Sequence, residues 1–93
     1  MKGTIYQIIN LTNKKCYVGS TTNLSRRRRA HFYDLRINKH HSISLQRAYK
    51  KYKKENFRLF VLETLEISLK EDLLKKEQYY IDLLKPEYNI CRI

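Results

Sequence analysis

The first nineteen residues predict a β-hairpin, and this prediction constrains the fold more than any other feature of the chain. Residues 4–9 (TIYQII) are β-branched or aromatic at nearly every position, which is typical of a strand. Residues 10–13 (NLTN) have turn chemistry, and residues 15–19 (KCYVG) form a second short strand. Gly19 ends this strand, where a glycine permits either the close approach of another group or a positive φ.

Two tyrosines lie on the predicted hairpin. Residues two apart in a strand share a face, and a turn centred between Leu11 and Thr12 would pair Tyr6 with Tyr17. The two phenols would then stand side by side on one face of the sheet. An aromatic pair that only packs is the simpler alternative, and it stays open.

The remaining segments complete the order ββααβα. We expect a helix over about 24–37, a helix over about 43–54, a strand over 57–65, a helix from about 69 to 84, and a short extended tail at 88–90. Ser42 can cap the second helix, Ser68 and Glu71 match a capping box for the last one, and Pro86 stops it. The simplest fold is α+β: a single domain over residues 1–93, with a three-stranded, largely antiparallel sheet and about three helices.

The charge of the chain is large and lopsided. Twenty Lys and Arg residues against nine Asp and Glu residues leave a formal charge of +11. Residues 1–54 carry a net charge of +13, whereas residues 55–93 carry −2. The first part is therefore expected to face a polyanion such as DNA.

Several classes of protein are excluded or disfavoured. The mean hydropathy is −0.67 and no apolar run approaches a membrane span, so a membrane protein is excluded. Without a secretory hydrophobic segment, an intracellular location is expected. Cys16 and Cys91 lie near opposite ends without a CxxC, which leaves a disulfide between them open. His31, His40 and His41 do not combine with either cysteine at zinc-finger spacing, which argues against a zinc site.

Glu77 breaks the apolar pattern of the last predicted helix. At about 100° per residue it falls in the middle of the arc formed by the apolar side chains of that helix. Those side chains are Leu69, Leu73, Leu74, Tyr80, Ile81 and Leu84. A carboxylate there is costly unless it is paired or binds a metal. Two explanations of Glu77 stay open: an ion pair with an Arg or Lys on another element, or a functional site.

The first predicted helix carries four consecutive arginines, 26–29. Its buried stripe consists of Leu24, Phe32 and Leu35. Arg27 and His31 are i,i+4 neighbours along one edge of that stripe and could project together into a cleft. Arg28 lies close to the stripe as well, so spacing does not choose between Arg27 and Arg28. A solvated basic face is the alternative for the whole run.

These residues together resemble a known nuclease motif. Residues 3–6 (GTIY) and 17–19 (YVG) resemble the two halves of the GIY-YIG motif, with Thr4 inserted and Val18 in place of Ile. The family's further polar positions follow in order as Arg27, His31, Glu77 and Asn89. The stretches 17–20 (YVGS) and 45–47 (LQR) look most like the catalytic domain of phage and intron-encoded homing endonucleases.

The resemblance implies a three-stranded antiparallel sheet surrounded by helices, and hydrolysis of DNA with one divalent cation. Mg²⁺ (or Mn²⁺) would be held by Glu77 as the sole protein ligand, because Mg²⁺ keeps its waters and binds the phosphate. Tyr17 would accept a proton from the attacking water, helped by Tyr6 and by a cationic site that lowers the tyrosine pKa. Arg27 would stabilise the phosphate and His31 would orient water or relay the proton. The resemblance also implies that Asn89 would brace the cleft. No small-molecule cofactor is expected.

Residues 26–54 hold eleven basic residues and one acidic residue, so we expect them to follow the phosphates. The predicted contacts are Arg26, Arg28, Arg29, His40, Arg47 and Lys50, with His41 as an alternative to His40. No predicted element carries side chains arranged to read base edges in the major groove. Homing endonucleases that resemble this chain usually carry a separate DNA-binding region. We expect a monomeric catalytic domain. A non-catalytic basic binding module, or a nuclease of repair or restriction, remains an alternative.

Overall fold

A three-stranded antiparallel sheet with strand order β2-β1-β3 forms the middle layer of the protein. The computed structural model describes residues 1–89. Strand β1 spans Lys2–Asn10, β2 Cys16–Thr21 and β3 Phe57–Glu66; helix α1 spans Leu24–Arg36, α2 Ile43–Tyr52 and α3 Lys70–Leu84. Short 3₁₀ turns lie at Lys54–Asn56 (η1) and Glu87–Asn89 (η2). The α+β class and the ββααβα order are confirmed.

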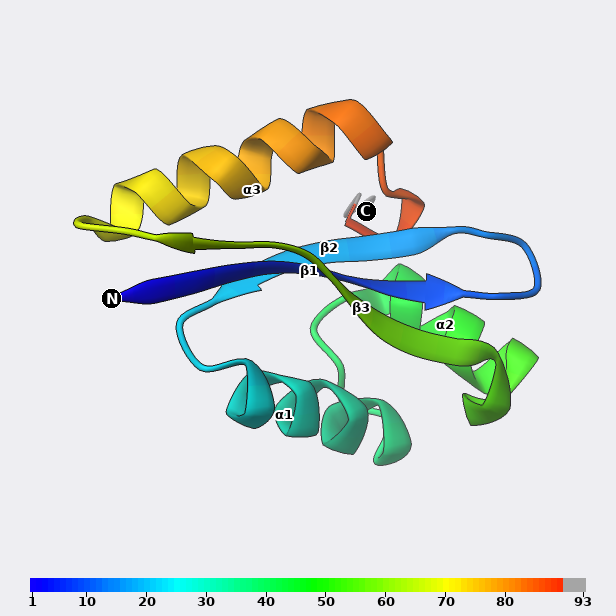
Figure 1. Ribbon diagram of the computed structural model, residues 1–93. Helices are drawn as coiled ribbons and strands as arrows, with labels where there is room; N and C mark the ends of the chain where they lie inside the picture. The colour runs from blue at the N-terminus through cyan, green and yellow to red at the C-terminus, as the bar shows by residue number, and fades with distance from the viewer. Residues whose placement is uncertain (90–93) are drawn as a thin grey trace.

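Helices cover both faces of the sheet (Figure 1), with α1 and α2 on one side and α3 on the other. On the first face Tyr6, Ile8 and Tyr17 pack with Leu35 of α1 and Leu45 of α2. The second core, against α3, consists of Ile5, Cys16, Val18, Ile67 and Leu73. Alternation along β1 and β2 therefore puts both tyrosines under α1 and α2.

The hairpin register differs from the prediction by two residues. Tyr6 lies opposite Gly19, and Tyr17 lies opposite Ile8. The turn is centred one residue later than expected, because the Asn10 side chain accepts the backbone N–H of Thr12 and Lys14 takes a left-handed φ of 65°. A shift of two preserves the face of every side chain, so the tyrosines share a face as predicted but stand diagonally.

The start of α3 was also predicted wrongly. The N-cap is Leu69, and the carboxylate of Asp72 accepts its backbone N–H at 3.4 Å, so Ser68 and Glu71 do not form the capping box. Ser68 comes too early because Ile67 is still held to the sheet, donating its N–H to the carbonyl of Met1 at 2.8 Å. In α2 the predicted cap is present: Ser42 Oγ accepts the N–H of Leu45 at 3.2 Å.

The end of the described chain is a turn and not the expected extended tail. Glu87–Asn89 form η2, and the Tyr88 side chain is buried in the core on the α1 and α2 face. Ile90, the last residue of the predicted tail, and Cys91 lie outside the described residues. No helix within residues 1–89 is long and apolar enough to cross a membrane.

Candidate active site

Gly19 lets the Tyr6 ring lie flat across the neighbouring strand. A Cβ atom at Gly19 would lie 2.5 Å from the phenol oxygen of Tyr6 and 2.6 Å from its Cζ atom. No glycine has a positive φ, so of the two roles expected for Gly19 the structure selects the close approach. The two halves of the motif therefore fit together sterically, and the Tyr6 phenol reaches the Nε2 atom of His31 at 2.5 Å.

His31 and His40 form a buried chain of hydrogen bonds that ends at Tyr6. Their side chains are 2% and 7% exposed, and His31 Nδ1 lies 2.7 Å from His40 Nε2. The backbone N–H of Ser42, which can only donate, points at His40 Nδ1 at 3.0 Å. Burial, followed by the neighbouring histidines, lowers the pKa of His31 to about 3 and that of His40 to about 4, so both rings are neutral near pH 7.

The backbone N–H of Ser42 and the neutral state of both rings fix which atom donates in each hydrogen bond from His40 to Tyr6. A neutral imidazole has one N–H, so His40 donates from Nε2 to His31 Nδ1, and His31 donates from Nε2 to the Tyr6 oxygen. The Tyr6 oxygen is thereby an acceptor toward His31, and its own proton is directed elsewhere. Burial raises the pKa of Tyr6 to about 12, against the opposing effect of Arg27. Tyr6 therefore stays protonated and can donate.

Tyr17 pairs with the second histidine of the loop. Its phenol oxygen lies 2.9 Å from Nε2 of His41, which is exposed. Burial raises the pKa of Tyr17 and outweighs the nearby Arg27, so the expected lowering of this pKa by cationic surroundings is not found. Both loop histidines therefore contact candidate site residues: His40 is hydrogen-bonded to His31, and His41 is hydrogen-bonded to Tyr17.

Glu77 is half-buried on α3 and accepts a short hydrogen bond from Ser20 Oγ. Among residues 1–89 no Lys or Arg forms an ion pair with it, so the simpler explanation of a structural ion pair finds no support there. The apolar arc is narrower than predicted: Leu73 is buried, but Leu74 and Leu84 are exposed. Glu77 thus lies at the margin of the core, where its carboxylate can reach solvent.

Arg27 and Glu77 line the same hollow, together with Ser20, Thr21 and Thr22. Arg27 comes from α1 and Glu77 from α3, on opposite faces of the sheet (Figure 1). They meet there because β2 is an edge strand, so side chains from both layers can surround its end. Of the two arginines that spacing could not separate, Arg27 lines this hollow and Arg28 does not.

The hollow suits a hard, hydrated cation. The described residues contain no group of three or more His, Cys, Asp or Glu side chains that could hold a metal ion. The oxygens at hand are those of Glu77 and Ser20. One carboxylate with hydroxyl and water ligands fits Mg²⁺ or Mn²⁺, which bind oxygen and retain water, and does not fit a tetrahedral zinc site.

Asn89 braces the edge of the sheet. Its side-chain oxygen accepts the N–H of Val18 at 2.7 Å, and its amide nitrogen donates to the Val18 carbonyl at 2.8 Å. Val18 lies on the free edge of β2, so these groups have no strand partner. Both ends of the Asn89 amide are thereby occupied, and the structure places it as a support of Tyr17 and Gly19 and not as a group facing the hollow.

The sequence prediction missed Gln46 as a site residue. The buried side chain accepts the backbone N–H of His40 and donates to the carbonyl of Leu35, both at 3.0 Å. It ties the histidine loop to the end of α1. A polar residue next to Leu45 on the buried face of α2 was the available signal, but its partners are distant in the sequence.

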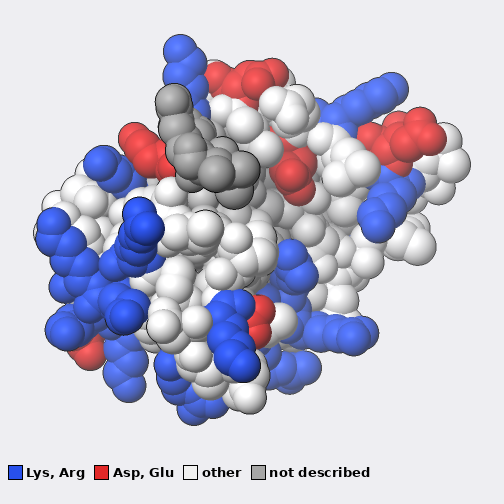
Figure 2. Space-filling model, turned by 180° about the vertical axis from the view of Figure 1, so that it is seen from behind, with Lys and Arg blue, Asp and Glu red and all other residues white. Residues whose placement is uncertain are grey.

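The predicted basic surface is largely present. Arg26, Arg28, Arg29, Arg47 and Lys50 are exposed. His40 is the exception, since it is buried against His31 and cannot lie on that surface. Figure 2 shows Lys and Arg gathered mainly over the lower part of the molecule, where α1 and α2 lie, whereas most of the acidic side chains lie above, toward α3.

Comparisons with known proteins agree with this geometry. The family model of the GIY-YIG catalytic domain matches residues 2–89. Intron-associated endonuclease 1 of Enterobacteria phage T4 is 40% identical over 90 residues, which are 96% of this chain but 36% of that protein. This chain thus spans about a third of its length.

Two solved structures have the same fold. The catalytic domain of homing endonuclease I-TevI superposes with a TM-score of 0.84 and 34% identity, covering 94% of this chain and 92% of that one. A glutamate-to-alanine mutant of the catalytic domain of intron endonuclease I-TevI gives 0.82 and 36%, covering 91% and 86%. The family model over residues 2–89 and these matches show that the chain belongs to the GIY-YIG catalytic domain family.

Proposed function

We propose that this chain is the catalytic domain of a homing-type DNA endonuclease that hydrolyses phosphodiester bonds with one divalent cation held by Glu77. The observation that carries the proposal is the shared hollow of Arg27 and Glu77, in which the carboxylate has no ion-pair partner among the described residues. A cation and a carboxylate that do not neutralise each other can serve a phosphate and a metal ion respectively. When bound, Mg²⁺ or Mn²⁺ would supply Lewis-acid stabilisation of the phosphate charge.

Tyr17 and His41 together would accept the proton of the attacking water. A tyrosine whose pKa is raised by burial is a poor base alone. His41 changes this, because burial and Arg27 lower its pKa, so it is neutral near pH 7 and has a lone pair available. Tyr17 would take the proton of water while passing its own to His41 Nε2, 2.9 Å away.

Tyr6 would act as a donor. Because its oxygen accepts from His31, its O–H is directed away from the histidine chain and can bond a phosphate oxygen beside Arg27. Arg27 would bind the same phosphate and stabilise the charge that develops on it. His31, held by His40, would keep Tyr6 in place. The two phenols would therefore have different roles: Tyr17 would transfer a proton, and Tyr6 would orient the substrate.

Nicking of supercoiled plasmid tests the proposal. With Mg²⁺, Glu77→Gln and Arg27→Ala should each lower the nicking rate by about 100-fold or more, and EDTA should abolish it. Glu71→Gln, an exposed carboxylate on the same helix, is the matched control and should nick normally. Equal nicking by the wild type and Glu77→Gln would refute the proposal. Salt-sensitive DNA retention without any nicking would favour the non-catalytic binding module.

The proposed proton step has its own test. Tyr17→Phe and His41→Ala should each reduce nicking by about 10²- to 10⁴-fold, and the double variant should lose little more, because the two groups act as a unit. Independent, multiplying effects would show that His41 does not receive the Tyr17 proton.

A further inference from the structure

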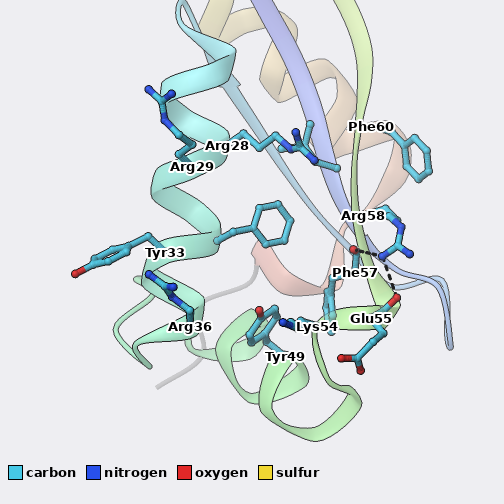
Figure 3. A pocket seen from close by; sticks show the side chains of 12 residues that line it. Arg28, Arg29, Tyr33, Arg36, Tyr49, Lys54, Glu55, Phe57, Arg58 and Phe60 are labelled. Carbon is cyan, nitrogen blue, oxygen red and sulfur yellow. Dashed lines mark hydrogen bonds between the residues drawn. The ribbon is translucent and has the colours of Figure 1, made fainter.

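A second basic groove lies beside the active site and is not used by the proposed chemistry. It runs between α1 and the start of β3 (Figure 3), and is lined by Arg28, Phe32 and Arg36 of α1, Tyr49 of α2, and Phe57 and Arg58 of β3. Arg27 lines the hollow that contains Glu77, and the next residue of α1, Arg28, lines this groove.

The groove has aromatic side chains along its length. Tyr49 and Phe57 pack with ring centroids 5.4 Å apart, and Phe32 is only partly buried. Tyr49 is partly buried like Phe32, so both keep part of their rings open to the groove. The more exposed rings of Tyr33 and Phe60 point away from the groove, outward from α1 and β3 (Figure 3). Rings that are partly open to a groove provide faces on which unpaired nucleobases stack.

The rest of the lining is cationic. Arg28, Arg29 and Arg36 come from α1, and Lys54 and Arg58 from η1 and β3, against the single carboxylate of Glu55. Among residues 1–89 none of these cations forms an ion pair. Arg58 donates to the carbonyls of Glu55 and Phe57 at 2.9 Å (Figure 3), which fixes its position.

We propose that this groove binds an unpaired strand of DNA, with phosphates on the arginines and bases on the aromatic rings. The guanidinium groups favour phosphate as the anion. Arg28 and Arg36 lie two turns apart on α1, roughly 12 Å, enough for a short run of nucleotides. Bases stacked inside a duplex do not present their faces to side chains, so a paired strand would leave the rings uncovered.

The proposal is separate from the catalytic assignment, because binding is measured without cleavage. The assay is fluorescence anisotropy of labelled oligothymidylate of about twelve nucleotides in EDTA, beside a duplex of the same length. Phe32→Leu and Tyr49→Leu should each weaken oligothymidylate binding about five- to a hundredfold, with little change for the duplex. Arg36→Gln should reduce the slope of log K against log salt by about 0.7.

Matched controls lie on the opposite helix layer. Tyr79→Ala removes an exposed ring from α3 and Lys75→Gln removes an exposed cation, and neither should change oligothymidylate binding. The proposal is overturned if the groove variants bind oligothymidylate like the wild type, or lose duplex binding equally. Tighter binding of a polyglutamate peptide, sensitive to the same variants, would overturn it in favour of an acidic protein segment. If this binding proposal fails, plasmid nicking still tests the role of Glu77 independently.

Discussion

Gly19→Ala should remove activity by displacing Tyr6, although the added methyl group carries no chemistry. The new Cβ atom would lie 2.5 Å from the phenol oxygen of Tyr6, 2.6 Å from Cζ and 3.1 Å from Cε1. Ordinary contact needs about 3.5 Å, so the ring must move by about 1 Å. Tyr6 is 1% exposed and hydrogen-bonded to His31, so it has no free space to move into.

Two consequences follow from this displacement. Overpacking a core of this kind costs about 1–3 kcal/mol of unfolding free energy. A misplacement of about 1 Å at a reacting centre can lower the rate about 100-fold, and the bond from His31 that orients the Tyr6 hydroxyl would be lost. We therefore expect a nicking rate reduced at least that far in protein that is still folded.

Gly3→Ala is the matched control. Its Cβ atom would lie 2.6 Å from Cδ1 of Leu73, on the opposite face of the sheet from the phenols. The nearest atoms there are the ends of flexible side chains, so the loss of stability should be similar or smaller. Plasmid nicking and urea denaturation of both variants separate the two effects. If Gly19→Ala nicks within about threefold of Gly3→Ala, the steric argument for the motif glycine is refuted.

Two further predictions concern the histidine loop. Gln46→Leu leaves the N–H of His40 and the carbonyl of Leu35 without partners. The unfolding free energy should therefore fall by about 1–3 kcal/mol, and nicking at saturating DNA should slow. Unchanged values in both assays would show that the histidine loop does not depend on Gln46. Because the folded-state pKa values of His31 and His40 are about 3 and 4, below the usual 6.5, the unfolded chain binds more protons between these limits. The urea midpoint should therefore be highest above about pH 6.5 and fall toward pH 4. His40→Gln should flatten that fall, and a midpoint that rises on acidification would contradict the neutral assignment.

Local chemistry was enough to predict the three strands, the three helices and the faces of the first two strands, but not the turn at Glu87–Asn89. Alternation in β1 and β2 put Tyr6 and Tyr17 on one face, and this survived the error in register because a shift of two preserves sidedness. Glu77 was singled out as a candidate because a carboxylate in an apolar arc is anomalous wherever the helix packs. The register itself depended on the side chain of Asn10 and the left-handed Lys14, a turn geometry with several sequence-compatible alternatives.

The composition of the site was decided by the tertiary structure. Spacing on α1 could not separate Arg27 from Arg28, because adjacent residues differ by only about 100° around the helix. In the folded protein Arg27 lines the same hollow as Glu77, whereas Arg28 lines the second groove. The direction of the His40 to Tyr6 chain is set by a backbone N–H at Ser42. The sequence alone therefore determined which side chains were available and on which faces. Which of them meet was determined by long-range contacts, because hydrogen bonds between distant segments leave no periodic signal in the chain.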